Sequence, residues 1–259
     1  MVPTSSIIAI IFNMVFGIAL GAFLVLILKK FRISLRPFLI GCAVWFVFAM
    51  ILEQFMHLAV LQSPVGGNIQ SSKWLYALYG GLAAGVFEES GRFLAMKYLL
   101  RKEHGDDRNA LSYGAGHGGF EAVFLLITGM INNLVYSVMI NNGTSDQLLS
   151  TLDGAQAEAL QKAFDSLIQS SPATFIVGPV ERISAVILHI ALSVLVWLAV
   201  TRKKTWLFPL AVFLHAFVDG FVVILSKSGV GMLPLEAIVF VMAASIAALA
   251  WYLWKAERN

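Results

Sequence analysis

Seven long apolar stretches dominate this sequence of 259 residues. A bilayer core about 30 Å thick needs about 20 apolar residues in a helix that rises 1.5 Å per residue. Stretches of that length cover approximately residues 6–28, 37–60, 74–100, 110–140, 174–200, 206–226 and 233–254. The sequence therefore predicts an all-α polytopic integral membrane protein with about seven transmembrane helices, forming a single domain over residues 1–259.

Composition agrees with this prediction and excludes other classes. Hydrophobic residues make up 59% of the chain and charged residues 13%, whereas roughly 25% of the residues in soluble domains are charged. A water-soluble enzyme is thereby excluded. The single cysteine, Cys42, cannot form an intramolecular disulfide, which excludes a disulfide scaffold. The net charge of +3 does not indicate a nucleic-acid partner, because the basic residues lie mostly in short loops.

Lys and Arg residues outside the apolar stretches are distributed unequally between alternating loops. The richer side holds Lys29, Lys30, Arg32, Arg36, Arg101, Lys102, Arg108, Arg202, Lys203, Lys204, Lys255 and Arg258. The other side holds Lys73, Lys162 and Lys227, with Arg182 at its margin. Because positive residues are retained in cytoplasmic loops, the N-terminus is predicted outside and the C-terminus in the cytoplasm. The outer connection, residues 141–173, is predicted to contain an amphipathic helix near residues 155–168.

Eight ionisable side chains lie deep within the third to sixth stretches, away from their ends: Glu88, Glu89, Arg92, His117, Glu121, His189, His215 and Asp219. A charged side chain at the bilayer centre costs roughly 2.5–3.5 kcal/mol on insertion scales. Counted from the basic loops at 1.5 Å per residue, all of these side chains lie roughly 12–21 Å deep. We therefore expect them to share a polar, water-filled cavity, and we expect that cavity to open toward the cytoplasm.

The spacing of these residues indicates chemistry on water. Residues four apart share a helix face, and three such pairs occur: Glu88 with Arg92, His117 with Glu121, and His215 with Asp219. A carboxylate can orient an imidazole, a base can take a proton from water, and further donors can stabilise an oxyanion. The pattern predicts a hydrolytic site that needs no nucleophilic Ser or Cys.

Four motifs carry a family resemblance: Glu88-Glu89-Ser90-Gly91-Arg92, Gly116-His117-Gly118-Gly119-Phe120-Glu121, His189 and His215-Ala216-Phe217-Val218-Asp219. Together they resemble the YhfC family of intramembrane peptidases over most of the chain. Over the third to sixth stretches the chain is more distantly similar to the type II CAAX prenyl endopeptidase and PrsW groups. Tyr113-Gly114-Ala115-Gly116-His117 matches their aromatic-x-x-x-His motif.

The resemblance implies an intramembrane protease of glutamic type in a bacterial plasma membrane, acting on membrane-embedded or membrane-associated peptides. Glu88 of the Glu88-Glu89 pair would then activate water with His117, and His215 with Asp219 would serve the oxyanion. His189 would be an additional site residue. Two residues separate Glu89 from Arg92 where the prenyl endopeptidase pattern has three, so the choice between the two glutamates stays open. No cofactor is expected in this interpretation.

Three alternatives use the same residues differently. In a zinc-dependent intramembrane metalloprotease, His117, His189 and His215 would bind zinc and Glu88 would act as base. The sequence supports this less, because it has no His-Glu-x-x-His motif. An ion-coupled transporter would use midplane carboxylates and histidines to bind a cation, but inverted repeats are not evident. A non-catalytic scaffold would not need all of the water-activating groups.

Several other features have two interpretations. Glu53 and His57 are predicted as a hydrogen-bonded pair near the outer surface, although a gate or substrate contact is the alternative. Glu181, Arg182 and Glu236 are assigned to helix starts. Gly114, Gly116, Gly118 and Gly119 surround His117, and they indicate either tight helix packing or room for an extended peptide.

Overall fold

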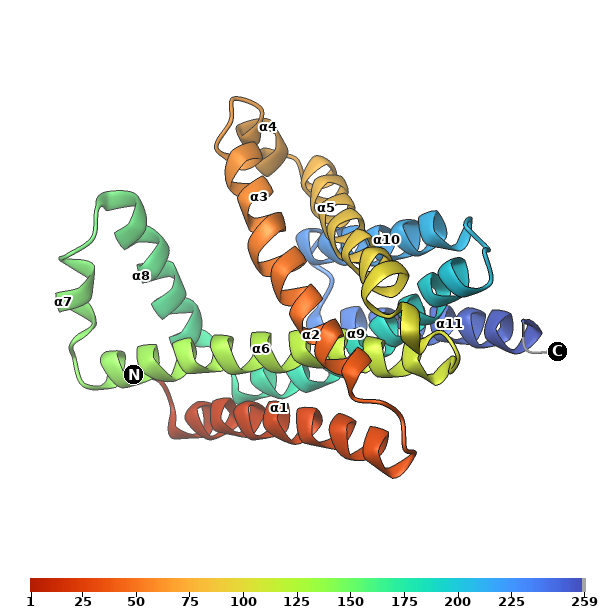
Figure 1. Ribbon diagram of the computed structural model, residues 1–259. Helices are drawn as coiled ribbons and strands as arrows, with labels where there is room; N and C mark the ends of the chain where they lie inside the picture. Colours follow the sequence, from red (N-terminus) through yellow and green to blue (C-terminus); the bar gives the residue numbers. More distant parts are fainter. Residues whose placement is uncertain (258–259) are drawn as a thin grey trace. The chain divides into compact units, whose positions relative to one another are not determined.

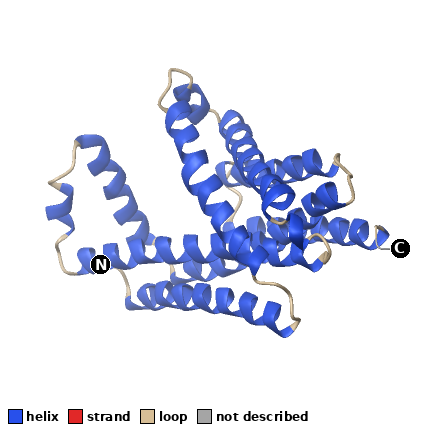
Figure 2. Cartoon of the chain, in the orientation of Figure 1, coloured by secondary structure: helices blue, strands red, loops and turns tan. Residues whose placement is uncertain are grey.

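The computed structural model describes residues 1–257, which fold into helices joined by short loops and contain no strand (Figures 1 and 2). The helices are α1 (Thr4–Lys30), α2 (Arg36–Val47), α3 (Glu53–Leu61), α4 (Gly66–Ser71), α5 (Lys73–Leu94), α6 (Arg108–Asn141), α7 (Ser145–Leu149), α8 (Gly154–Gln169), α9 (Pro172–Thr201), α10 (Leu207–Lys227) and α11 (Met232–Ala256). π-Helical segments Phe48–Leu52 and Ala95–Leu99 follow α2 and α5, and a short 3₁₀ helix spans Arg101–Glu103. The predicted all-α class is therefore confirmed.

Six helical segments of the described chain are long and apolar enough to cross a membrane: Thr4–Lys30, Arg36–Leu61, Arg108–Asn141, Pro172–Thr201, Leu207–Lys227 and Met232–Ala256. They match six of the seven predicted stretches. The remaining stretch, 74–100, corresponds to α5 and its π-helical extension. Glu88, Glu89 and Arg92 lie in α5. The number of crossings and the orientation stay predictions. Arg258, counted on the basic side, lies outside the described residues.

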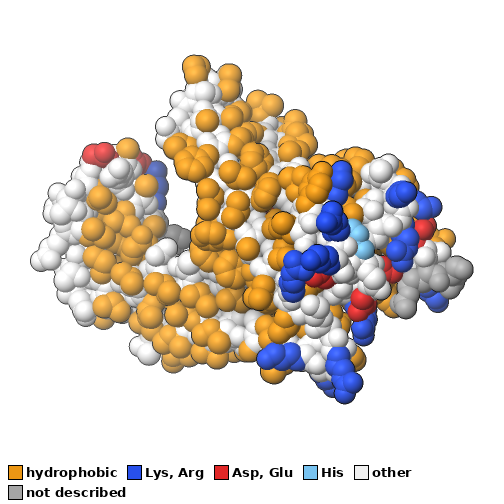
Figure 3. All heavy atoms as spheres, viewed as in Figure 1, with side chains coloured by type: hydrophobic (Ala, Val, Ile, Leu, Met, Phe, Trp, Pro, Cys, Tyr) orange, Lys and Arg blue, Asp and Glu red, His pale blue; other side chains and the backbone are white. Residues whose placement is uncertain are grey.

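Many large apolar side chains are exposed on the outside of the protein, as expected where lipid replaces water. Leu39, Phe55 and Tyr252 are each more than 60% exposed. Hydrophobic side chains cover much of the face drawn in Figure 3, and most of its Lys and Arg side chains gather in one region. A soluble protein rarely exposes an apolar surface of this extent, so the surface supports the membrane assignment.

The chain divides into two compact units, and the boundaries between them fall within α1, α6 and α9. The smaller unit contains residues 1–21 and 123–180. Its apolar core includes Ile10, Leu167 and Phe175, and Asn13 Nδ2 donates at 2.8 Å to the carbonyls of Ala9 and Phe175. Helix α8 of this unit confirms the helix predicted near residues 155–168.

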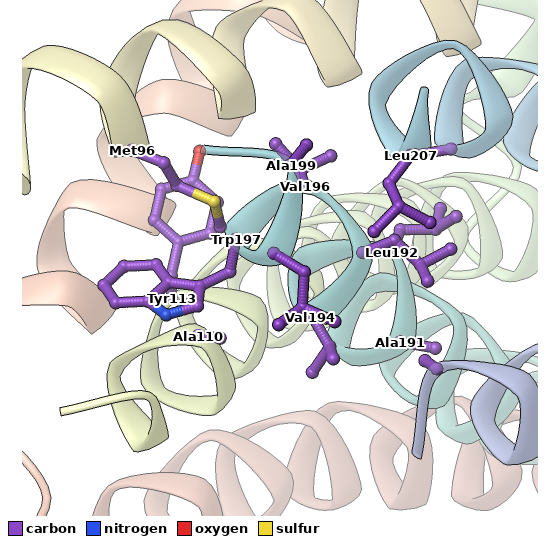
Figure 4. Packing of buried hydrophobic residues seen from close by; sticks show 14 of the residues in the cluster. Met96, Ala110, Tyr113, Ala191, Leu192, Val194, Val196, Trp197, Ala199 and Leu207 are labelled. Atoms are coloured by element: carbon purple, nitrogen blue, oxygen red, sulfur yellow. The ribbon is translucent and has the colours of Figure 1, made fainter. Parts of the chain in front are cut away.

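The larger unit contains residues 22–122 and the chain from residue 181 onward, and α9 passes through its core. Every residue from Ala191 to Ala199 on α9 is buried. Figure 4 shows Trp197 of this run beside Met96 and Tyr113, which come from two other helices. Lipid tails are as apolar as leucine, so close packing rather than water exclusion stabilises this core.

Glycines let α5 and α10 approach each other closely (Figure 1). A Cβ atom added at Gly81 would lie 2.3 Å from the carbonyl oxygen of Ala216, and one added at Gly85 would lie 2.7 Å from that of Val212. Small residues at such positions allow two helix backbones to pack with many van der Waals contacts. This contact holds the acidic residues of α5 against His215 of α10.

Candidate active site

Four helices of the larger unit bring the eight predicted site residues into one cluster. Helix α5 contributes Glu88, Glu89 and Arg92, α6 contributes His117 and Glu121, α9 contributes His189, and α10 contributes His215 and Asp219. Six of them are buried, Glu121 is partly buried, and the Asp219 side chain is 40% exposed. The residues thus meet as their common depth predicts, while their catalytic roles stay predictions.

At the centre of the cluster, Glu88 and His117 contact each other directly. Glu88 Oε2 lies 2.8 Å from His117 Nε2, and the His117 side chain is completely buried. His117 Nδ1 has no hydrogen-bond partner among the described residues. Glu88 Oε2 is also 4.0 Å from His189 Nδ1, and the rings of His117 and His189 lie 4.9 Å apart between centroids. Two imidazoles and one carboxylate therefore surround a single small space.

Arg92 fixes the orientation of His189. Its Nη2 lies 3.0 Å from His189 Nδ1, and its Nη1 lies 3.2 Å from Glu89 Oε1. Because a guanidinium only donates, His189 Nδ1 accepts this hydrogen bond, and the ring proton is assigned to Nε2. Nε2 lies 2.7 Å from a Glu121 carboxylate oxygen. The carboxylate beside Nε2 and the guanidinium beside Nδ1 thus select one tautomer of His189.

His215 lies between two carboxylates. Its Nδ1 is 2.8 Å from Glu89 Oε1, and its Nε2 is 3.4 Å from Asp219 Oδ2. Glu89 is completely buried, so its contacts with Arg92 and His215 compensate its carboxylate. The adjacent glutamates therefore have separate partners, Glu88 facing His117 and Glu89 facing His215.

Arg182 belongs to the cluster, although it was assigned to a helix start. Helix α9 begins at Pro172, so both Glu181 and Arg182 lie within the helix and the assignment is wrong. Arg182 Nη1 lies 3.3 Å from Glu121 Oε1, and its Nη2 pairs with Glu181. The sequence did contain a signal, because Arg182 precedes His189 by seven residues and so lies two turns away on the same helix face.

A cavity of about 290 Å³ reaches the cluster. Glu88, His189 and His215 line its inner part, and Glu181 and Glu236 lie among its other lining residues. Among its lining residues, side-chain exposure ranges from 3% for His215 to 46% for Glu181. At roughly 30 Å³ per molecule, the cavity has room for several waters.

The predicted pairing of Glu53 with His57 is present. Glu53 Oε1 lies 3.2 Å from His57 Nε2, and His57 Nδ1 lies 2.8 Å from the Tyr79 hydroxyl. Since Tyr79 is on α5, the contact of His57 with Tyr79 connects α3 with that helix. The Glu53–His57 contact agrees with the interpretation as a hydrogen-bonded pair.

The glycines around His117 serve helix packing. A Cβ atom at Gly116 would lie 2.0 Å from the Phe38 carbonyl oxygen, and one at Gly118 would lie 2.7 Å from the Cβ of His189. Gly114 and Gly119 are equally tight against α9 and α1, since a Cβ at either would come within 2.6 Å of a neighbouring atom. The interpretation that they leave room for an extended peptide is therefore wrong.

The residues best placed to hold a metal ion are Glu88, His117 and His189, whose ligand atoms lie within 4.8 Å of one another. The predicted zinc set contained His215 in place of Glu88, but both His215 ring nitrogens face carboxylates. Two imidazoles and a carboxylate form a known ligand set of catalytic zinc. His189 also has the carboxylate on its far nitrogen that metal-bound histidines usually have. The residues present therefore fit a zinc ion, provided that Arg92 releases His189 Nδ1.

Comparisons with known proteins agree with this geometry. A family described as YhfC intramembrane metalloprotease matches residues 14–243. The uncharacterized membrane protein YhfC of Bacillus subtilis (strain 168) is 38% identical over 236 residues, which cover 89% of this chain and 88% of that protein. No solved structure matches the chain.

Proposed function

The chain belongs to the YhfC intramembrane metalloprotease family, and we propose that it is a metal-dependent peptidase that cleaves membrane-embedded or membrane-associated polypeptides. The observation that carries this proposal is the buried group of Glu88, His117 and His189, of which Glu88 and His189 line a cavity. A family name alone assigns no residues, whereas this group has the ligand types and the water access that hydrolysis needs. Its location in a bacterial plasma membrane is consistent with the Bacillus relative.

Glu88, His117 and His189 would hold the metal ion, with zinc expected from their ligand types. When bound, zinc lowers the pKa of a coordinated water and polarises the substrate carbonyl. The charges of the cluster also favour a cation. Its four carboxylates outnumber the guanidinium groups of Arg92 and Arg182, and uncompensated buried charge is costly.

The other side chains would position these groups and move protons. Hydrolysis adds the water oxygen to the carbonyl carbon, breaks the C–N bond and delivers a proton to the departing nitrogen. His215, held by Glu89 at Nδ1, presents Nε2 toward the cavity beside Asp219 and can pass that proton. Glu121 holds the second ring nitrogen of His189 and thereby orients its imidazole.

A metal-free, glutamic-type mechanism is the second candidate, and a specific contact favours it. Glu88 Oε2 and His117 Nε2 form a direct 2.8 Å hydrogen bond, and Arg92 donates to the His189 nitrogen that a metal would need. In this mechanism Glu88 takes the proton from water and His117 orients the water. Both candidates require Glu88 and His117, so metal content separates them and substitution alone does not.

Metal analysis of the purified protein and mapping of cleavage sites in membranes together test the proposal. Zinc would be measured in the wild-type protein, in His117→Ala and in His57→Ala, a matched control because His57 is another membrane histidine paired with a glutamate. New polypeptide N-termini would be mapped by mass spectrometry in membranes of cells that express the wild type or Glu88→Gln.

We expect one zinc per chain in the wild type and in His57→Ala, and none in His117→Ala. New N-termini should occur in membranes with the wild type and be absent with Glu88→Gln. Cleavage that persists without bound metal and in the presence of a chelator would favour the glutamic-type candidate. N-termini that are identical in wild-type and Glu88→Gln membranes would contradict a peptidase altogether.

A further inference from the structure

The candidate site has an open end and a closed end. At its open end, the cavity is lined by Arg182 and Ala185, which precede His189 on α9, and by Val222, which follows His215 on α10. Glu236 near the start of α11 lines it too. These residues all lie toward the end of the helices where α9 and α11 begin and α10 ends. The cavity therefore extends from the site toward that end.

Toward the other end, a tightly packed apolar cluster separates the site from the basic loops. On each of the four site helices, buried residues of this cluster lie between the site residue and the basic loop. They include Met96 in the π-helical extension of α5, Tyr113 before His117 on α6, Leu192 and residues 194–199 after His189 on α9, and Leu207 and Ala211 before His215 on α10. Met96, Tyr113 and Leu192 have no exposed surface, and Figure 4 shows the packing of this cluster.

Water crosses such a cluster poorly, because a close-packed apolar interior has neither space nor polar partners for it. The charged lining of the cavity, in contrast, supplies hydrogen-bond partners from the buried Glu88 to the partly exposed Glu181 and Asp219. The sequence led us to expect an opening toward the cytoplasm, the side of the basic loops, and the cavity runs the opposite way.

We propose that the site exchanges water only with the side of the membrane opposite the basic loops, and that it cleaves substrates on that side. With the predicted orientation, this is the outer side, so the substrate class is polypeptide segments at the outer face or in the outer half of the bilayer. The assignment of the substrate side rests on the proposed peptidase function. The assignment of the water path rests on the cavity and the apolar cluster alone.

Cysteine labelling tests the water path without any need for activity. In a Cys42→Ala background, Ala185→Cys and Val222→Cys place a thiol in the cavity wall, while Ala110→Cys places one in the apolar cluster. Met232→Cys and Lys102→Cys mark the two sides of the membrane. A charged, membrane-impermeant methanethiosulfonate is then added to sealed vesicles of either orientation, and the variants are checked for a monodisperse folded state in detergent.

We expect Ala185→Cys and Val222→Cys to be labelled when the reagent is on the side that labels Met232→Cys. They should stay unlabelled when the reagent is on the side that labels Lys102→Cys. Ala110→Cys should stay unlabelled from both sides. Labelling of the wall cysteines from the Lys102 side, from both sides or from neither would overturn the proposed path.

Mapping of cleavage sites separates the two proposals. Glu88-dependent N-termini should lie on the Met232 side of substrate membrane spans. If such N-termini exist but lie on the Lys102 side, the peptidase function stands and the proposed sidedness fails. If no Glu88-dependent N-termini exist while the wall cysteines label as expected, the water path stands and the peptidase function fails.

Discussion

Replacement of Arg92 by methionine should destabilise the protein strongly, because Arg92 is completely buried and compensates a buried carboxylate. Arg92 Nη1 lies 3.2 Å from Glu89 Oε1, and both side chains have no exposed surface. Removal of one partner from such a pair costs about 3–5 kcal/mol, since it leaves an unpaired buried charge. The unfolding equilibrium should therefore shift roughly a hundredfold to several thousandfold toward the unfolded state.

A second substitution identifies the cause of that loss. In Arg92→Met/Glu89→Gln the unpaired carboxylate is gone, so much of the stability should return, and the remaining loss should be about 1–3 kcal/mol for unsatisfied neutral groups. Lys162→Met is the control for an exposed pair. Lys162 Nζ lies 2.7 Å from Glu158 Oε1, but the two side chains are 74% and 68% exposed. Loss of this exposed pair should lower the free energy of unfolding by at most about 0.5 kcal/mol.

The free energy of unfolding would be measured by reversible unfolding in mixed micelles with increasing sodium dodecyl sulfate, followed by circular dichroism. If Arg92→Met stays within about 1 kcal/mol of the wild type, the pair behaves like an exposed one and the reasoning is wrong. The same holds if the double variant is no more stable than Arg92→Met.

Three further predictions concern activity, metal binding and packing. Glu88→Gln should lower cleavage by at least about 10²-fold, because the variant lacks the carboxylate that would hold the metal ion or, in the glutamic-type mechanism, take the proton from water. The exposed Glu158→Gln should stay near wild type, and equal rates for both variants would contradict the role of Glu88. A chelator should abolish cleavage by the wild type, and added zinc should restore it. Added zinc should give no cleavage with His117→Ala, and cleavage by that variant would contradict the assignment of His117 as a metal ligand. Gly81→Ala should lower the free energy of unfolding by about 1–3 kcal/mol, because the added Cβ would meet the α10 backbone. Gly80→Ala is the control and should not destabilise the protein, since its Cβ meets nothing within 4 Å. Similar effects of the two substitutions would argue against tight α5–α10 packing.

Much of the site could be identified before the structure because burial of charge in a membrane is so costly. Glu88, His117, His189 and His215 were selected as ionisable residues within apolar stretches, and the structure places them in contact. Arg182 was missed for a related reason. It lies near the predicted end of an apolar stretch, where a charge is ordinary, and only its contact with Glu121 shows that it belongs to the cluster.

The pairing of the residues could not be predicted in the same way. Spacing favoured partners on one helix, such as Glu88 with Arg92 and His117 with Glu121. In the structure Glu88 contacts His117 of another helix, and Glu121 contacts His189. Which side chains meet depends on the rotation of each helix about its axis, and packing against neighbouring helices sets that rotation.

What the sequence determined by itself is the set of helices and the depth of their polar residues, because the lengths of apolar runs and the rise per residue are local properties matched to the bilayer. What only the tertiary structure decided is the set of metal-ligand candidates and the direction in which the cavity opens. Glu88 rather than His215 joins His117 and His189, and an apolar cluster fills one end of the site while charged residues line the other. Both outcomes arise from contacts among four helices that are distant in the chain, and no local pattern encodes such contacts.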